Sequence, residues 1–317
     1  MPSSNRPPAR ETSENPNTKG DTGARRISQI DTGPPSLSSI EPGAARWIAS
    51  LIRVASTHAS MSHILDVMDR LEQRPYKTNV VLLGPPGTGK DGLARALHSL
   101  MAPGTPLIRL DVSGLSEAEA AEALCGAGRT PGAAEQADGG YLLIEELASL
   151  PIRAQGDLLR LLKAGKIQRV DATAPTKNRV QVNAIAISDR NLANEVAAGR
   201  LRHDLYYRLA RLVMVLPPLR ERLDDVAAAA IWMGNRILRG AALPLVLRGT
   251  EDYASSTEDE RRRSIELSAE ALSALRKHDW PGNFRELEAV MERALLLYRS
   301  GGRLGAEAVD LALAGTI

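Results

Sequence analysis

This chain has few aromatic residues and almost no excess of charge of either sign. Phe, Trp and Tyr make up 3% of its 317 residues, and 40 basic residues face 38 acidic ones, which leaves a net charge of +2. Proteins that bind single-stranded nucleic acid stack bases on aromatic rings, and most nucleic-acid-binding domains carry a clearly basic surface. The composition therefore gives no reason to expect nucleic-acid binding as the main activity.

Cysteine is nearly absent as well. Because Cys125 is the single cysteine, no disulfide can form within the chain, which is typical of proteins in a reducing compartment. The sequence has no signal-peptide pattern and no apolar run long enough to cross a bilayer. We therefore expect a cytoplasmic protein. Its length suffices for one large domain and a smaller one, with cores that need no disulfides.

A glycine-rich run follows an apolar stretch at 80–83 and precedes leucines at helical spacing. It reads Gly84-Pro85-Pro86-Gly87-Thr88-Gly89-Lys90-Asp91. The spacing G-x-x-x-x-G-K predicts a strand, a tight loop and a helix N-terminus, whose backbone N–H groups and lysine bind a polyphosphate. Asp91 stands where such loops usually have a Ser or Thr that contacts Mg²⁺. The alternative is an ordinary Gly/Pro turn between a strand and a helix.

Two adjacent carboxylates follow another apolar stretch. Glu145 and Glu146 come directly after the apolar residues 141–144. Downstream of a phosphate loop, this pattern is typical of an ATPase site in which Glu145 serves Mg²⁺ and Glu146 polarises the attacking water. The alternative is an exposed acidic strand end beside a helix start, where carboxylates interact favourably with the helix dipole.

Strand-like and helical patterns alternate along most of the chain. The strand-like stretches lie at 80–83, 107–110, 141–144, 180–187 and 212–216. This alternation predicts an α/β fold with a parallel sheet covered by helices on both faces. We predict a disordered tail at 1–43, an α/β nucleotide-binding domain at 44–220, whose first helical pattern runs from about 47 to 71, and a second domain at 221–317.

The second domain has a helical pattern throughout, apart from a polar insertion near 250–264 that we expect to be an exposed loop or a frayed helix. Ser268 is placed to cap one of its helices. Asn283, with Glu286 three residues later, has the spacing of a capping box for another. We therefore expect a wholly helical domain.

Four further strings stand in the order typical of one family. They are ADGG at 137–140, DLYYRL at 204–209, LPPLRER at 216–222 and WPGNFREL at 280–287. With them, the segment from about 52 to 313 resembles the AAA+ domain of bacterial enhancer-binding proteins, the activators of sigma-54 RNA polymerase. The resemblance implies a P-loop AAA+ sheet, a small α-helical lid domain, and a hexameric ring that hydrolyses ATP with Mg²⁺ at subunit interfaces and remodels the polymerase holoenzyme through surface loops.

The resemblance also implies roles for residues at matching positions. Lys90 would bind the β- and γ-phosphates, and Glu146 would be the catalytic carboxylate. An acid after the lysine is common in the family, so Asp91 and Glu145 become the expected metal ligands. The phosphate loop from Gly84 to Asp91 would bind the nucleotide.

Three arginines also match family positions. Arg202 and Arg208 would be arginine fingers that enter the neighbouring subunit's site, and Arg285 would be the lid-domain sensor of bound nucleotide. An arginine supplied by a neighbour makes hydrolysis depend on assembly. By spacing alone, Arg202 and Arg208 pair with nearby acids instead.

Four features depart from the family pattern. The family's long loop with the signature Gly-Ala-Phe-Thr-Gly-Ala, which contacts the sigma factor, is reduced here to Ala127–Pro131. Glu145 replaces an aspartate but keeps an anionic oxygen ligand. Asp111 and Asp189 replace two asparagines near the γ-phosphate. A negative charge about 4 Å from a phosphate oxygen costs roughly 4 kcal/mol at an effective dielectric constant near 20, which corresponds to a turnover roughly a thousandfold slower.

The sequence thus supports two main hypotheses and a third. The first is a ring-forming ATPase, a homo-oligomer or a hetero-oligomer with a related ATPase, that regulates transcription or remodels a protein client such as a sigma factor. The second is a nucleotide-gated binding module that scarcely hydrolyses ATP and joins or inhibits hexamers of a relative. The third is a structural remnant. Family members usually continue into a helix-turn-helix domain beyond the position of Leu313, so we expect no DNA-binding domain in this chain.

Overall fold

The computed structural model describes residues 27–30, 59–170, 179–298 and 302–315. Most of the tail at 1–43 and the start of the helical pattern expected from about 47 lie outside these residues. The exception is β1 (Ile27–Ile30), which pairs antiparallel with β3 (Leu107–Asp111) where the sequence predicted disorder. A strand at the edge of a sheet has unpaired backbone N–H and C=O groups that favour the addition of another strand.

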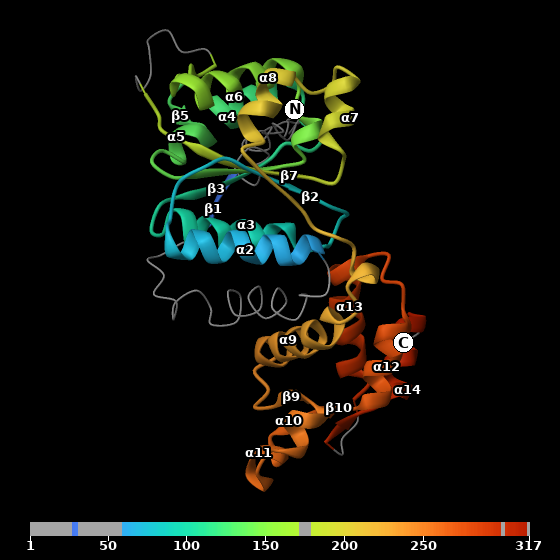
Figure 1. Cartoon of the computed structure of the whole chain (residues 1–317). Helices are drawn as coiled ribbons and strands as arrows, with labels where there is room; N and C mark the ends of the chain where they lie inside the picture. Colours follow the sequence, from blue (N-terminus) through green and yellow to red (C-terminus); the bar gives the residue numbers. More distant parts are fainter. Residues whose placement is uncertain (1–26, 31–58, 171–178, 299–301, 316–317) are drawn as a thin grey trace, which may run out of the picture.

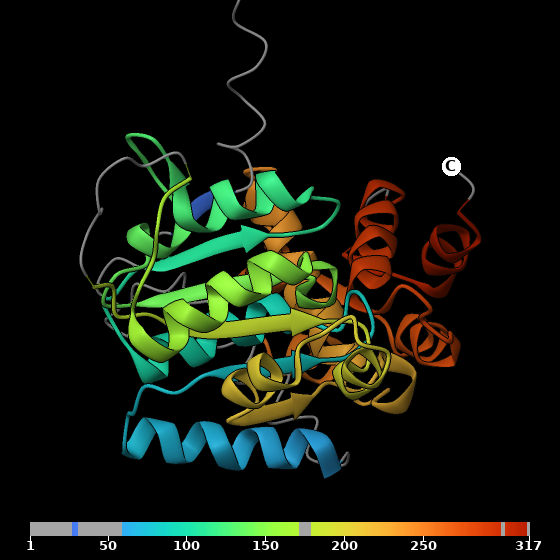
Figure 2. The ribbon, with the colours of Figure 1, turned by 90° about the horizontal axis from the view of Figure 1, so that it is seen from above.

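The central sheet has the strand order β1-β3-β6-β7-β2-β8. All strands except β1 pair in parallel, and the remaining bounds are β2 (Val80–Leu83), β6 (Tyr141–Glu145), β7 (Asn183–Ser188) and β8 (Leu212–Val215). Their carboxyl ends therefore meet at one edge of the sheet. Figure 2 shows the arrows of these strands pointing toward the C-terminal domain.

Helices cover both faces of the sheet, as Figure 1 shows. On one face lie α2 (Ala59–Gln73) and α3 (Lys90–Met101). On the other lie α4 (Glu117–Cys125), α5 (Ala133–Gln136), α6 (Ile152–Ala164), α7 (Leu192–Ala197) and α8 (His203–Leu209). The predicted parallel α/β sheet between helices is confirmed.

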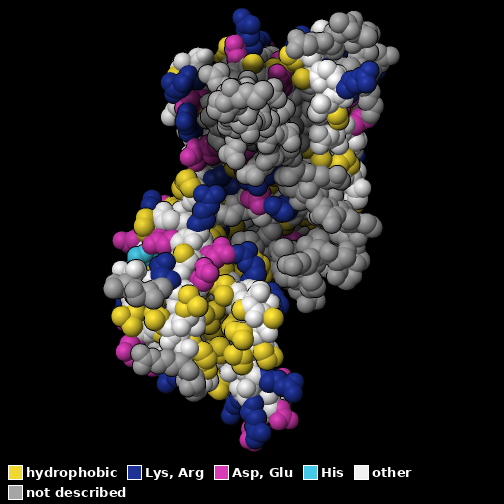
Figure 3. Space-filling model, turned by 180° about the vertical axis from the view of Figure 1, so that it is seen from behind, with side chains coloured by type: hydrophobic (Ala, Val, Ile, Leu, Met, Phe, Trp, Pro, Cys, Tyr) yellow, Lys and Arg dark blue, Asp and Glu magenta, His cyan; other side chains and the backbone are white. Residues whose placement is uncertain are grey.

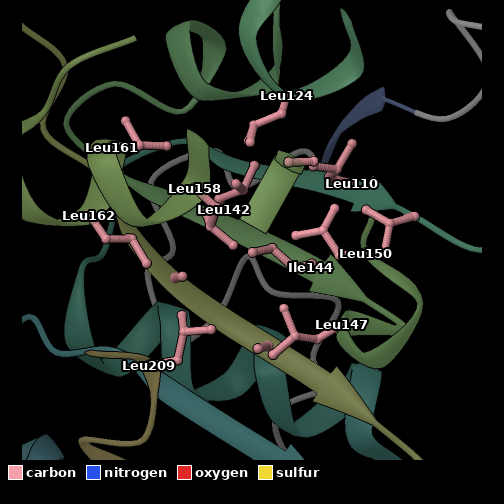
Figure 4. Packing of buried hydrophobic residues seen from close by; sticks show 14 of the residues in the cluster. Leu110, Leu124, Leu142, Ile144, Leu147, Leu150, Leu158, Leu161, Leu162 and Leu209 are labelled. Carbon is pink, nitrogen blue, oxygen red and sulfur yellow. The ribbon is translucent and has the colours of Figure 1, made fainter. Parts of the chain in front are cut away.

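The apolar strands divide their side chains between two cores because successive residues of a strand point to opposite faces. In β6, Leu142 and Ile144 belong to the core under α4 and α6, whereas Leu143 belongs to the core under α2 and α3. Figure 4 shows Leu142 and Ile144 packed among leucines of the covering helices, including Leu158 of α6. These cores fix the strand ends that carry the site.

The C-terminal domain is a helical lid with a small sheet. Its helices are α9 (Asp225–Gly240), α10 (Thr250–Ala254), α11 (Glu258–Arg262), α12 (Ala269–Lys277), α13 (Asn283–Leu296) and α14 (Ala306–Ala314). The short 3-10 helix η3 (Leu219–Glu221) connects β8 to this lid. The predicted helical lid is confirmed, but the expectation of a wholly helical domain is wrong.

Three short parallel strands run through the lid. They are β9 (Val246–Gly249), β10 (Ser264–Leu267) and β11 (Arg303–Leu304), in the order β11-β10-β9. The polar insertion at 250–264 folds mainly as α10 and α11 and supplies the crossover that parallel pairing of β9 with β10 requires. Sequence periodicity missed these strands because each has at most four residues.

Two predicted helix caps in the lid differ in outcome. Ser268 accepts a hydrogen bond from the backbone N–H of Ala271 and caps α12, as predicted. At α13, Glu286 accepts from the backbone N–H of Gly282, but the side chain of Asn283 makes no capping bond and binds other segments. The capping box is therefore wrong for Asn283, whose amide is used in tertiary contacts.

Hydrophobic side chains gather on the lid in the view of Figure 3. The large exposed hydrophobic residues of the lid are Leu243, Val246, Leu296 and Leu311. Within the described ranges, every helix is too short or too polar to span a lipid bilayer.

Candidate functional site

The phosphate loop joins β2 to α3 and turns through three left-handed glycines. Gly84, Gly87 and Gly89 have φ values of 147°, 76° and 98°. A Cβ atom on Gly84 would lie 2.4 Å from the carbonyl oxygen of Leu216, and one on Gly87 would lie 2.5 Å from that of Gly282 in the lid. The first and second glycines are thus required by close backbone approach as well as by conformation.

Lys90 begins α3 and is 8% exposed. Its Nζ donates hydrogen bonds to the carbonyl oxygens of Gly84 (2.5 Å) and Pro85 (2.9 Å). Burial lowers the pKa of Lys90, and the carboxylates of Asp189, Glu146 and Glu145 oppose this shift. The ammonium group therefore lies inside the curve of the loop and faces the predicted acids.

The remaining loop residues bind one another or neighbouring segments. The Thr88 hydroxyl donates to the carbonyl oxygen of Pro85 at 2.9 Å, and the Thr88 side chain is buried. The carbonyl oxygen of Pro86 accepts a hydrogen bond from the side-chain amide of Asn283 at 3.0 Å. These contacts fix the loop in one curved conformation.

Both carboxylates predicted to hold Mg²⁺ form ion pairs with arginines. Oε2 of Glu145 lies 2.6 Å from Nη2 of Arg109, and Oδ2 of Asp91 lies 3.1 Å from Nε of Arg95. Oδ1 of Asp91 is buried and has no hydrogen-bond partner among the described residues. Carboxylate oxygens are the ligands that Mg²⁺ prefers, so Asp91 fits a cation through Oδ1, whereas Oε2 of Glu145 is engaged by Arg109.

Glu146 follows β6 in a left-handed conformation, with φ 55° and ψ 45°. Non-glycine residues seldom adopt this conformation, and it is concentrated at functional sites. Burial raises the pKa of Glu146, and the nearby carboxylate of Asp189 raises it further, while Lys90 and Arg190 lower it. The carboxylate of Asp189 therefore favours the protonated form of Glu146.

Asp111 ends β3 directly beside Glu145 of β6. Its Oδ1 accepts hydrogen bonds from the backbone N–H and the hydroxyl of Ser113, at 2.9 and 2.6 Å. One of its two carboxylate oxygens is thus used to hold the turn after the strand.

The lid contacts the phosphate loop through the start of α13. The backbone N–H of Phe284 donates to the carbonyl oxygen of Gly87 at 3.0 Å, and the stem of Arg285 lies beside the same glycine. Oδ1 of Asn283 accepts from the backbone N–H of Leu219 in the connecting segment, at 2.7 Å. Arg285 is exposed, and its charge lowers the pKa of Lys90. The expected lid sensor therefore borders the loop.

Arg222 is a residue of this region to which the sequence analysis gave no role. It is 3% exposed, and its Nη2 donates to the carbonyl oxygen of Thr88 at 2.7 Å. Its guanidinium also lies 4.8 Å from the ring centre of Phe284 and 3.6 Å from Oδ2 of Asp225. In the sequence, Arg222 follows Pro217-Pro218 and has an acid, Asp225, three residues later. This pattern fits an exposed ion pair as well as it fits the buried one.

Arg202 directly precedes α8, Arg208 lies in its last turn, and both bind groups outside the phosphate loop. Arg202 is exposed and makes a bidentate ion pair with Asp204, at 3.0 and 3.1 Å. Arg208 donates to the carbonyl oxygen of Leu162 near the end of α6, at 2.6 and 3.1 Å. Within one subunit, both arginines are thus held by neighbouring groups.

The shortened loop at Ala127–Pro131 is a tight hairpin. The strands β4 (Gly126–Ala127) and β5 (Thr130–Pro131) pair antiparallel. The backbone N–H of Val170 donates to the carbonyl oxygen of Gly126, and the carbonyl oxygen of Val170 accepts from the N–H of Gly128. A mostly buried ion pair between Arg169 and Glu135 supports the base of this hairpin. The segment is compact and closed by its own hydrogen bonds.

Family comparisons match both parts of the chain. The sigma-54 interaction domain matches residues 54–215, and the AAA+ ATPase lid domain matches residues 247–315. One similar protein is the nitric oxide reductase transcription regulator NorR2 of Cupriavidus necator, which is 38% identical over 71% of this chain and 41% of that protein. Another is the Nif-specific regulatory protein of Azotobacter vinelandii, which is 32% identical over 76% of this chain and 44% of that protein. The chain thus spans less than half of these relatives.

Solved structures agree with these matches. NtrX from Brucella abortus in complex with ATP has a TM-score of 0.67 and 25% identity, and the alignment covers 82% of this chain and 54% of that one. The complex of the same protein with ADP has a TM-score of 0.68 and 24% identity, and its alignment covers 88% of this chain and 59% of that one. This second match supports the fold. Because the match at residues 54–215 covers just over half of the sequence, the chain belongs to the sigma-54 interaction domain family of AAA+ ATPases.

Proposed function

We propose that this chain binds ATP at the loop from Gly84 to Asp91 and hydrolyses it in a ring of subunits. The supporting observation is the position of Lys90, a buried ammonium group inside a loop of left-handed glycines, opposite the carboxylates that end β6 and β7. A buried cation beside free backbone N–H groups at a helix start suits a polyphosphate. The solved complex of NtrX with ATP, a relative by fold and sequence, supports the same ligand.

The residues of the chain divide the work between binding and hydrolysis. Lys90 binds the outer phosphates, and Glu146 orients and polarises the attacking water. Mg²⁺, when bound beside Asp91, would neutralise charge on the phosphates, while Oε2 of Glu145 is engaged by Arg109. Asp111 ends β3 and Asp189 follows β7, the two strands on either side of β6, and both add negative charge near the γ-phosphate.

Three arginines complete the proposed site. Arg202 and Arg208 enter the site of the next subunit after leaving Asp204 and the carbonyl oxygen of Leu162. Arg285 responds to the bound nucleotide from the lid, and its stem already borders Gly87. Hydrolysis then depends on assembly, because an isolated subunit has no arginine from a neighbour.

The named relatives are transcription regulators, so we propose that this ATPase regulates transcription in the cytoplasm by acting on a protein client, with the sigma factor of RNA polymerase as the first candidate. We propose that its ring is either a homo-oligomer, with the hexamer as the state to test, or a hetero-oligomer with a related ATPase. The compact hairpin at 126–131 offers little surface for the sigma factor, so a different loop or client remains the competing outcome.

ATP binding is tested by titrating the protein with a fluorescent ATP analogue. Lys90→Ala should weaken binding at least about tenfold, since it removes a cation from a buried polyphosphate site. Lys163→Ala is the matched control, because Lys163 is exposed at the end of α6, and it should leave the affinity unchanged. Equal affinities of the wild type and Lys90→Ala would overturn the proposal.

A second candidate function is a nucleotide-gated module that binds ATP but scarcely hydrolyses it. Two observations favour it, namely the raised pKa of Glu146 beside Asp189 and the neutralisation of Glu145 by Arg109. Both weaken the groups that hydrolysis needs. Affinity and turnover measured on the same preparation separate the two functions, because the module binds ATP tightly with negligible turnover.

A further inference from the structure

Arg109 lies near the carboxyl end of β3, on the side of the sheet where the metal site is expected. It belongs to β3, two residues before the strand ends at Asp111, and pairs in register with Leu143 of β6. Its Nη2 donates to Oε2 of Glu145 at 2.6 Å. A charge-assisted bond of this length is among the stronger ones in proteins, so one oxygen of Glu145 is firmly engaged.

Two further carboxylates act on the same guanidinium. The hydrogen bond and charge of Glu145 raise the pKa of Arg109, and the charges of Asp91 and Asp111 raise it further, while burial opposes them. Nε of Arg109 and Oδ1 of Asp91 are both buried without a hydrogen-bond partner in the described part of the chain. Carboxylates from β3, α3 and β6 thus act electrostatically on a cation that the chain itself provides, and Glu145 of β6 contacts it directly.

We propose that Arg109 is a positioning residue that holds Glu145. Its guanidinium supplies part of the positive charge that a metal ion would otherwise provide, so this chain binds ATP with a weak requirement for Mg²⁺. The inference rests on the proposed ATP site. A divalent cation beside Glu145 would have to displace the guanidinium or lie next to it, and like charges at that distance repel. Arg109 therefore excludes metal from Glu145, and Asp91 retains the free oxygen.

The metal alone provides the first test, without nucleotide. Binding of Mn²⁺, the probe, is measured by electron paramagnetic resonance on the wild type and on Arg109→Gln. Arg109→Gln should bind Mn²⁺ at least about tenfold more tightly, because the charge that repels the metal is gone. Adding Glu145→Gln to this variant should abolish the gain, whereas Arg109→Lys, which keeps the charge, should behave as the wild type.

Arg200→Gln is the matched control, because Arg200 also pairs with a carboxylate, Glu195 at 2.6 Å, in the same domain but outside the site. It should leave Mn²⁺ binding unchanged. If Arg109 only stabilised the sheet edge, Arg109→Gln would lower the unfolding temperature without any change in Mn²⁺ affinity. That result would overturn the inference.

The second test uses the wild type and remains valid if Arg109→Gln does not fold. The affinity for a fluorescent ATP analogue is measured in EDTA and in excess Mg²⁺, and the two values should differ by less than about threefold, well under one unit of log affinity. A difference of about tenfold or more would contradict the inference. Absence of ATP binding in both conditions would refute the proposed function alone, because the Mn²⁺ titration still decides the role of Arg109.

Discussion

Arg222 holds the carbonyl oxygen of Thr88 at 2.7 Å, across 134 residues of sequence, and so joins the start of the lid to the end of the phosphate loop. The guanidinium is almost fully buried between Phe284 and Asp225. A buried arginine in this position stabilises a loop conformation that backbone preferences alone do not secure.

Removal of Arg222 should therefore destabilise the protein and weaken ATP binding. Arg222→Ala leaves Asp225 buried without its positive partner, which costs about 3–5 kcal/mol of unfolding free energy. Urea unfolding at pH 8 checks this value, and a nucleotide titration checks the affinity. Arg220→Ala is the control, since Arg220 is exposed and only 4.0 Å from Glu221, and it should cost less than about 0.5 kcal/mol. Equal stability of the two variants would contradict the assigned role.

Asp225 predicts a pH dependence of stability. Burial raises the pKa of Asp225 to about 7, even though Arg222 opposes the shift. The folded state therefore binds a proton that the unfolded state, with an ordinary pKa near 4, releases. The unfolding free energy should fall as pH rises from about 4 to about 7, by about 1.4 kcal/mol for each unit of pKa shift. Asp225→Asn should remove this fall when the unfolding free energy is measured by urea unfolding at several pH values. If the variant kept the pH dependence of the wild type, Asp225 would not be its cause.

Asp189 predicts a shift in the pH profile of ATP hydrolysis. Burial and the neighbouring carboxylate of Asp189 raise the pKa of Glu146, so less Glu146 is ionised at a given pH. Because a protonated Glu146 cannot polarise water, the rate should rise with pH through this raised pKa. Asp189→Asn should move the rise to lower pH and increase the rate there about tenfold. Steady-state rates of ATP hydrolysis from pH 5 to 8, measured on the wild type and on Asp189→Asn, test this prediction. Identical pH profiles of the two proteins would exclude an effect of Asp189 on Glu146.

Assembly predicts a dependence of the hydrolysis rate on protein concentration. If Arg208 acts in the neighbouring subunit, the rate per subunit should rise with concentration, and Arg208→Ala should lower it by about a thousandfold or more. Arg211→Ala is the matched control, as Arg211 is exposed just after α8. Thermal unfolding of Arg208→Ala is measured as well, because the side chain also holds the carbonyl oxygen of Leu162. A rate per subunit that is flat with concentration would remove the arginine-finger role.

Gly87 predicts a specific effect of one methyl group. In Gly87→Ala the new Cβ would lie 2.5 Å from the carbonyl oxygen of Gly282, so the lid must move. ATP affinity should fall at least about tenfold. Gly104→Ala is the control, because Gly104 has φ +73° but nothing within 4 Å of the added atom, and it should cost only about 1 kcal/mol of conformational strain. Equal ATP affinities for the two variants would show that the lid contact does not matter.

The sequence predicted the sheet and the phosphate loop because both have local signals. The loop has fixed glycine spacing, and the run at 141–144 identified a buried strand whose end carries Glu145 and Glu146. Parallel strands bring their carboxyl ends to one edge, whereas the positions of Asp111 and Asp189 near the γ-phosphate were implied by the family resemblance.

Contacts between distant segments were not predictable in the same way. The pairing of Arg109 with Glu145 spans 36 residues, and the bond from Arg222 to Thr88 spans 134. No periodicity encodes these partners, because an arginine on a strand or after a proline has many acceptors within reach. Asn283 illustrates the limit, since its spacing indicated a helix cap and its amide instead binds Pro86 and Leu219.

The lid turn at 282–284 lies directly on the loop that would wrap the phosphates, with Phe284 bonded to Gly87 and Asn283 to Pro86. Lid orientation and ligand affinity are then linked by a single free energy, and such linkage is reciprocal. A client that tilts the lid would change the affinity for the nucleotide by the same factor by which the nucleotide changes the affinity for the client. Binding of a protein far from the loop would thereby set how tightly ATP is held.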